Sequence, residues 1–202
     1  MTAARSDQSL SGTLLAATTR LDDTPFRRAL ILCCEHGPAG AMGLMVNRPC
    51  PDLRRRHGLL IHRGGPREPG RAFLLHPPDG AGTGSGEKDS GGDGGLDEEG
   101  EKRGQIEELP LPCGLVLSAS LGRLEDAVRR GGPERGLLMA GYMDWPAGEI
   151  EAGIGRHDWL PVPFSADVVL DLEDARKWEA ALGRLGIGPD ALAGLSATGG
   201  RA

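Results

Sequence analysis

The sequence predicts an α+β protein, with a mixed β-sheet and about three to four helices. Short apolar stretches bounded by Gly and Pro come first, and stretches with a helical repeat appear in the second half. The 202 residues, of which 39% are hydrophobic, suit one domain spanning 1–202 with its own core. Aromatic residues make up only 3%, so we expect a core built from aliphatic side chains.

Strands are expected wherever a short apolar run lies between turn residues. The expected strands span 11–17, 28–34, 42–47, 58–63, 72–76, 113–117, 136–142, 158–162 and 167–170. The Gly64-Gly65-Pro66 and Glu68-Pro69-Gly70 segments predict the turns between the fourth and fifth of these strands.

The clearest helix is expected over 121–130. Leu121, Leu124 and Val128 have the spacing i, i+3, i+7, so they share one helical face that we expect to pack on the core. Gly131 suits the end of this helix. Two further helices are expected, a short one around Ile150 and Ile154 that is entered through Trp145-Pro146, and a last one between Asp171 and Gly186.

Residues 79–104 interrupt this pattern. They contain ten glycines, and Leu96 is their one sizeable apolar side chain. Eight acidic and three basic residues give this segment a formal charge of -5 out of the chain's -6. We expect a disordered, Gly-rich acidic insertion that expands a surface loop, with an acidic docking arm for a basic partner as the alternative.

Charge and composition exclude some classes of function. Outside the acidic insertion the chain is close to neutral, so a general affinity for nucleic acid has no electrostatic support. The dense basic patch Arg54-Arg55-Arg56-His57 is expected in a solvated loop, and no helix-turn-helix pattern is visible.

Compartment is predicted from the cysteines and from hydropathy. Cys33, Cys34, Cys50 and Cys113 form no C-x-x-C pair, and free thiols are typical of the cytoplasm. No apolar run approaches the roughly 20 residues of a membrane-spanning helix. We therefore expect a soluble cytoplasmic protein without membrane contact.

Polar residues lie at the ends of two successive expected strands. Glu35 and His36 could act as an acid–base pair or anchor the following turn, and the anchoring role is favoured. The Asn47 amide can pin its turn by accepting from one backbone N–H while donating to a carbonyl. Arg48, held extended by Pro49, could clamp an anion or pair with Glu35, and the internal pair is favoured. If these side chains converge, they form the best polar pocket of the molecule.

Other motifs of reactive sites are missing. Gly64-Gly65-Pro66 lacks the Lys-Ser/Thr of a phosphate-binding loop and is expected to be a structural turn. His57, His62 and His76 lack the spacing of metal ligands. The sequence has no G-x-S-x-G elbow. We therefore expect no catalytic residue, no metal and no cofactor.

Several motifs in a fixed order resemble the AlgH/YqgE family. They are Glu35-His36, Gly40, Met42-Gly43, Asn47-Arg48-Pro49, Gly64-Gly65-Pro66, residues 71–76, Tyr142, Trp145 and Glu149. The resemblance covers nearly the whole chain outside 79–104. It implies that the sheet curls into a barrel-like core flanked by helices.

This family has no established reaction and carries the historical label of a transcriptional regulator. Glu149 stands where relatives commonly have Gln, which adds a charge. Trp145 is expected at the core rim rather than in a ligand site.

We therefore expect a non-enzymatic regulatory or interaction protein that acts through protein or small-molecule partners. The alternative is a hydrolase-like enzyme that uses a pocket of Glu35, His36, Asn47 and Arg48. The third hypothesis is direct DNA binding, which the charge distribution disfavours.

Overall fold

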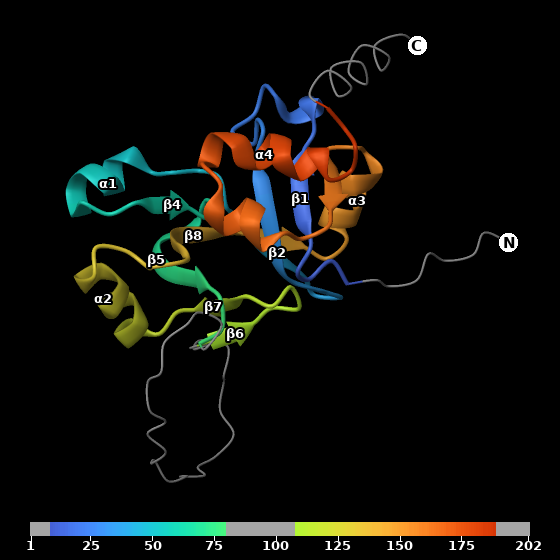
Figure 1. Ribbon diagram of the computed structural model, residues 1–202. Coiled ribbons are helices and arrows are strands. Elements are labelled where there is room, and N and C mark those ends of the chain that lie inside the picture. Colours follow the sequence, from blue (N-terminus) through green and yellow to red (C-terminus); the bar gives the residue numbers. More distant parts are fainter. Residues whose placement is uncertain (1–8, 80–107, 189–202) are drawn as a thin grey trace, which may run out of the picture.

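The computed structural model describes residues 9–79 and 108–188, with the side chains of 55–57 excepted. In these residues the strands form one curled sheet in the order β6-β7-β5-β8-β3-β2-β1-β9, with β4 beside β8 (Figure 1). Neighbouring strands are antiparallel except β4 and β8, which are parallel. The sheet forms a half-barrel, and the predicted α+β class with a mixed, barrel-like sheet is confirmed.

The strands are β1 (Leu14–Ala17), β2 (Leu30–Gly37), β3 (Gly40–Met45), β4 (Ile61–Arg63), β5 (Arg67–His76), β6 (Glu108–Pro110), β7 (Val116–Ser118), β8 (Leu137–Pro146) and β9 (Trp159–Val162). The helices are α1 (Pro51–His57), α2 (Leu121–Arg129), α3 (Glu149–Gly155) and α4 (Asp174–Gly183), with a short 3-10 helix η1 (Thr19–Leu21) and a π-helix η2 (Asp167–Asp171). None of these helices is long and apolar enough to cross a membrane.

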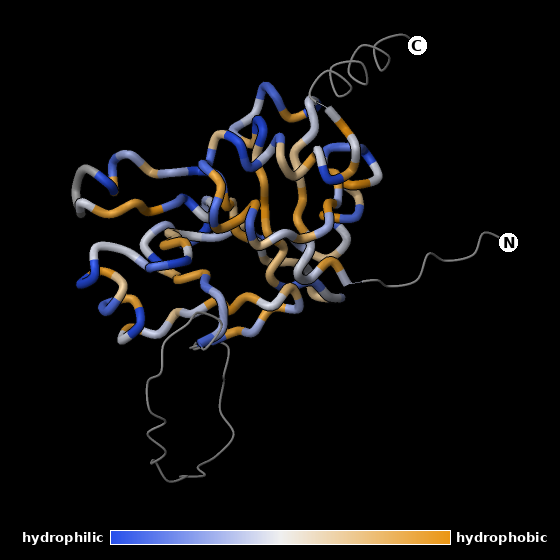
Figure 2. Tube along the Cα trace, viewed as in Figure 1, coloured by the Kyte–Doolittle hydropathy of each residue, from blue (hydrophilic) through white to orange (hydrophobic). Residues whose placement is uncertain are grey.

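The centre of the sheet is covered on both faces. In β1, Leu14 belongs to the cluster that contains Trp178 of α4, and Leu15 belongs to the cluster that contains Trp159. Figure 1 shows α4 lying across β1 and β2, with α3 beside β1. Burial on both faces explains why these strands are continuous apolar runs, which are the orange central strands of Figure 2.

Four element predictions are wrong. The turn expected at Glu68-Pro69-Gly70 lies within β5, where the pairing with β8 shifts register between Arg67 and Ala72. The segment 167–170 is not a strand but part of the π-helix η2, in which Val168 and Val169 are both buried. The basic segment expected as a loop forms α1, which has Pro51 at its start and is ended by Gly58 with φ 70°. Strand β8 runs on to Pro146, so α3 is entered through Gly148 rather than through Trp145-Pro146.

Helix α2 forms as predicted, but it packs through a different face. Leu121 is 77% exposed and Val128 is 52% exposed, while Ala127 is buried. Ala127 and the half-buried Leu124 contact Leu74 of β5 in a small separate cluster. The helix therefore leaves part of its predicted core face in solvent. The predicted insertion, 79–104, lies outside the described residues except for Asp79.

Candidate binding site

The polar residues of the β2–β3 hairpin do not converge. Antiparallel pairing places His36 opposite Ala41 near the turn and Ile31 opposite Met45 at the other end. Asn47 and Arg48 follow β3, which ends at Met45, so they lie at that second end. Five residues along a strand span about 16 Å. The predicted pocket of Glu35, His36, Asn47 and Arg48 is therefore not formed.

His36 anchors the neighbouring chain segments. The Leu10 N–H donates to its Nδ1 at 3.2 Å, so the ring proton is on Nε2, which lies 2.9 Å from a carboxylate oxygen of Glu151 in α3. Its backbone N–H donates to the Ser11 hydroxyl at 2.9 Å. Glu35, by contrast, is exposed, and its carboxylate has no hydrogen bond or ion pair in the described part of the chain. His36 and Glu35 thus make no acid–base pair.

Asn47 and Arg48 bind backbone groups at the start of β2. The buried Asn47 amide accepts from the Leu30 N–H at 2.9 Å and donates to the Arg28 carbonyl at 2.8 Å. Arg48 donates to the carbonyl of Arg27 and, at 3.4 Å, to that of Asn47. Burial lowers the pKa of this guanidinium. The predicted Arg48–Glu35 pair is wrong, because the two residues lie at opposite ends of the hairpin.

The Gly64-Gly65-Pro66 segment lies directly against β8. A Cβ on Gly64 would come within 2.1 Å of the Gly141 carbonyl oxygen, and one on Gly65 within 2.1 Å of the Tyr142 carbonyl carbon. Only glycine permits such a close approach of two backbones. The Gly64 carbonyl also accepts from Met45 at 2.8 Å, so the segment joins β3 to β8.

The remaining signature residues are spread over the sheet. The Tyr142 hydroxyl donates to Glu68 at 2.9 Å, and this bond raises the pKa of Tyr142. Trp145 is buried with its ring edge-on to Trp159. Glu149 is the exposed first residue of α3. In β3, Gly43 is buried and Gly40 and Met42 are half-buried, whereas Pro49 and Pro66 are exposed.

A buried polar cluster that the sequence did not reveal joins α4 to the sheet. Lys177, 1% exposed, donates to the Val46 carbonyl at 2.9 Å and lies 2.7 Å from Asp174. His62 Nε2 lies 3.0 Å from the same carboxylate. Burial raises the pKa of Asp174, but the hydrogen bonds and charges of His62 and Lys177 outweigh it, so the pKa is lowered overall. This cluster balances its charges internally.

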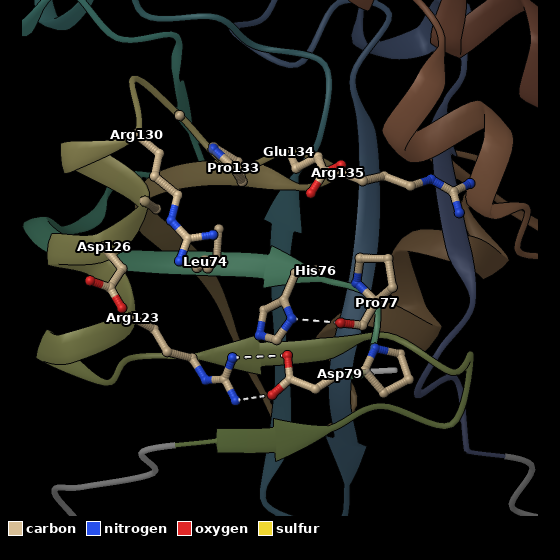
Figure 3. A pocket seen from close by; sticks show the side chains of 13 residues that line it. Leu74, His76, Pro77, Asp79, Arg123, Asp126, Arg130, Pro133, Glu134 and Arg135 are labelled. Atoms are coloured by element: carbon tan, nitrogen blue, oxygen red, sulfur yellow. Dashed lines mark hydrogen bonds and ion pairs between the residues drawn. The ribbon is translucent and has the colours of Figure 1, made fainter. Parts of the chain in front are cut away.

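A hollow of about 480 Å³ lies between the end of β5, helix α2 and the loop that leads into β8 (Figure 3). Its lining is rich in charged side chains of both signs. The lining residues are Leu74, His76, Pro77, Pro78, Asp79, Arg123, Asp126, Ala127, Arg130, Gly132, Pro133, Glu134 and Arg135.

His76 presents an unpaired acceptor on the wall of this hollow. Its Nδ1 lies 2.6 Å from the Pro77 carbonyl oxygen, so Nδ1 carries the ring proton and donates it. The lone pair is then on Nε2, which is buried and has no hydrogen-bond partner. Figure 3 shows this second nitrogen on the side of the ring that faces α2. A buried polar atom left unpaired costs about 1–3 kcal/mol.

Most charges around the hollow are paired. Both terminal nitrogens of Arg123 donate to the Asp79 carboxylate, which lowers the pKa of Asp79, and Arg123 also pairs with Glu108. Arg135 pairs with Asp171 at 2.7 Å, outside the hollow. Asp126 pairs with Arg129 at 2.7 Å.

Two side chains of the lining keep a free charge. Arg130 and Glu134 are exposed, and neither side chain has a hydrogen bond or ion pair with residues 9–79 or 108–188. Figure 3 shows the Arg130 side chain extending from the end of α2 to Leu74 of β5. The hollow thus combines a free cationic donor with a buried neutral acceptor.

A second hollow, of about 400 Å³, lies beside Gly65 and Pro66 and is also lined by Cys50 and Arg63. No side-chain atom of its lining is both buried and unpaired, in contrast to His76. Across the described residues no group of three His, Cys, Asp or Glu side chains could hold a metal ion. The first hollow is therefore the stronger candidate binding site.

No pattern in the sequence predicts this hollow. The charged residues that line it form ion pairs across long stretches of sequence, since Arg123 and Asp79 are 44 positions apart. The lone pair on His76 Nε2 depends on the hydrogen bond from Nδ1 to the Pro77 carbonyl, which the residue types alone do not predict. The sequence places Arg130 only at the end of the helix expected over 121–130.

Comparison with known proteins decides the family. The sequence model described as AlgH-like matches residues 14–190. The chain belongs to the AlgH-like family. A UPF0301 protein of Ruegeria pomeroyi is 38% identical to it, with 96% of this chain and 99% of that protein covered. A UPF0301 protein of Cereibacter sphaeroides is 35% identical, with the same coverage.

Solved structures show the same AlgH-like fold. The solution structure of the AlgH protein from Pseudomonas aeruginosa has a TM-score of 0.61 and 26% identity, covering 100% of this chain and 98% of that one. A crystal structure of a Corynebacterium diphtheriae protein has a TM-score of 0.62 and 16% identity, covering 94% and 93%. At that identity the second likeness concerns the fold alone.

Proposed function

We propose that this AlgH-like protein is a non-enzymatic binding module that takes a small ligand in the hollow between β5 and α2. The volume of about 480 Å³ lies within the range of small-molecule sites. One observation carries the proposal. His76, whose Nε2 is buried and unpaired, lines the same hollow as Arg130, whose guanidinium is free. A ligand that binds both groups would relieve the cost of the unpaired nitrogen.

Binding is favoured over catalysis by what lines the hollow. Its lining contains no Ser, Thr, Cys, Lys or Tyr that could serve as a nucleophile. The hydrolase-like alternative also loses its site, since Glu35 and His36 lie at the opposite end of the hairpin from Asn47 and Arg48. Arg130 can hold an anion, and His76 Nε2 can accept a hydrogen bond from a bound ligand.

The proposal sets this function in the cytoplasm and without direct DNA contact. The described cysteines are all free thiols, which supports a reducing compartment. Arg123, Arg129 and Arg135 are neutralised by carboxylates, which leaves little free positive charge near the hollow for a phosphate backbone. A regulatory role would then act through the bound ligand.

A thermal-shift screen of small carboxylates, phosphates and sulfate tests this proposal. A ligand present at about 100 times its Kd stabilises the folded protein by about 2.7 kcal/mol, which raises Tm by several degrees. We expect at least one compound to stabilise the wild type and Arg184→Ala, a control at an exposed arginine near the end of α4. Arg130→Ala should show no shift. Equal stabilisation of Arg130→Ala, or no shift for any compound, would contradict the proposal.

A protein partner is the second candidate, and it is favoured by the exposed apolar side chains of α2. Leu121 and Val128 are 77% and 52% exposed on one side of this helix. Affinity capture should compare the wild type with the double variant Leu121→Ser/Val128→Ser. Proteins that are captured by the wild type and lost with the variant would support this candidate, and an unchanged set would exclude this surface.

A further inference from the structure

We infer that the ligand of the hollow is an oxyanion that also carries a proton, with hydrogen phosphate as its smallest member. This inference rests on the proposed function and names the chemical class of the ligand. It follows from two complementary groups, the donor fork of Arg130 and the acceptor at His76 Nε2.

Arg130 supplies the attraction for an anion. A guanidinium is planar and permanently charged, and it binds an oxyanion through two parallel hydrogen bonds. The other arginines of the lining are already occupied, because Arg123 binds Asp79 and Glu108, and Arg135 binds Asp171. An anion in the hollow therefore takes its charge-assisted bonds from Arg130.

His76 selects among anions. Donation of its Nδ1 proton to the Pro77 carbonyl at 2.6 Å leaves Nε2 with a lone pair only. A ligand O–H or N–H can donate to this lone pair, whereas a fully deprotonated oxygen is repelled by it. The nitrogen has almost no solvent-accessible surface, so a ligand must first displace part of the lining to reach it.

Two charged side chains of the lining are free to move as a ligand enters the hollow. Arg130 is exposed, and the side chain of Asp79 has a relative exposure of 72%. Exposed side chains change rotamer within nanoseconds. Arg130 can thus turn to meet a small anion without any rearrangement of β5 or α2.

The other charges near the hollow affect affinity more than selectivity. Asp126 is engaged by Arg129 and Asp79 by Arg123, so Glu134 is the remaining free carboxylate of the lining. It is exposed, and water screens its repulsion of an anion. Glu134→Gln should therefore strengthen the binding of every anion without changing the preference among them.

Hydrogen phosphate and sulfate form a matched pair of probes. They have nearly the same size and shape, but at pH 7 only phosphate carries a proton. The full chain would be titrated with each at equal ionic strength by isothermal titration calorimetry. We expect phosphate to bind at least about tenfold tighter than sulfate, since a site with a buried acceptor rejects a ligand that lacks the donor. Arg130→Ala should lose both.

His76→Gln tests the origin of the selectivity. A glutamine amide can turn its NH₂ group to a sulfate oxygen, so the two affinities should fall within about threefold of each other. If this variant does not fold, the ¹⁵N resonance of His76 Nε2 in the wild type gives the same answer, because phosphate should shift it and sulfate should not.

The outcomes separate the two proposals. Equal, Arg130-dependent binding of phosphate and sulfate would overturn the ligand class and leave the binding function intact. If phosphate does not bind while another compound of the screen binds through Arg130, the ligand class is likewise overturned and the binding function stands. Binding of phosphate that survives Arg130→Ala would overturn both.

Discussion

Asn47 holds the start of β2 through two hydrogen bonds, one to Leu30 and one to Arg28. Asn47→Ala leaves a buried N–H and a carbonyl without partners, so we expect a loss of about 1–3 kcal/mol in the free energy of unfolding. Glu35→Ala is the control within the same motif, because that exposed side chain should change stability by less than about 0.5 kcal/mol. Urea denaturation of both variants measures this. A stable Asn47→Ala would show that the motif is not a scaffold.

Asp174 compensates the buried charge of Lys177, 2.7 Å away. Removing one partner of a buried pair costs about 3–5 kcal/mol. Because the Asp174 carboxylate is partly exposed, we expect Asp174→Asn to lower the free energy of unfolding at pH 7 by an amount at the lower end of this range. Adding Lys177→Met removes the uncompensated cation and should recover most of the loss.

The same carboxylate makes stability depend on pH. Its pKa is lowered in the folded state, so its contribution is present above the unfolded value of about 3.9 and is lost as pH falls through the folded pKa. The stability gap between wild type and Asp174→Asn should therefore be constant from pH 7 to about 5 and shrink below pH 4. A gap that stays constant down to pH 2.5 would contradict the ion pair.

Helix α2 contacts the sheet through Leu124 and Ala127 and not through Leu121. Leu124→Ala should cost about 1–2 kcal/mol, which is reduced from the value for a fully buried leucine because the site is half-exposed. Leu121→Ala is its match on the same helix and should change stability by less than about 0.5 kcal/mol. Thermal unfolding of the pair is the measurement, and equal losses would refute this packing.

Local patterns predicted the elements better than the contacts between them. Apolar runs located β1, β2, β3 and β5, and the helical repeat located α2, because these signals lie within a few residues of each other. The apolar run at 167–170 predicted a strand, yet these residues form η2. For α2 the helical spacing was correct, but the predicted buried face was wrong. The spacing of Leu121, Leu124 and Val128 does not determine which of the three contacts the sheet.

The candidate site was harder to predict than the fold for the same reason. Asn47 was expected to hold two backbone groups, because an amide at a strand end has that capacity. The separation of Glu35 from Arg48 depends on hairpin length and register. The His62–Asp174 contact joins residues 112 positions apart, a distance over which sequence patterns carry no information.

At the scale of the whole molecule, we predict that the acidic insertion is dispensable for folding. Its glycine content and charge give it little apolar surface to bury. A short Gly/Ser linker should replace 80–104, sparing Asp79 and Glu108 because both pair with Arg123. We expect Tm to change by less than about 4 °C, and a loss of more than about 2 kcal/mol would show that the segment packs.

The central claim is that the hollow beside His76 binds the ligand and that the hairpin motif is a scaffold. Amide chemical shifts recorded during a titration of the full chain with hydrogen phosphate test it most directly. We predict that the changes centre on residues 76–79 and 130–136, with residues 35–37 and 46–49 unaffected. Changes centred on Glu35, His36, Asn47 and Arg48, with the hollow unperturbed, would contradict the account.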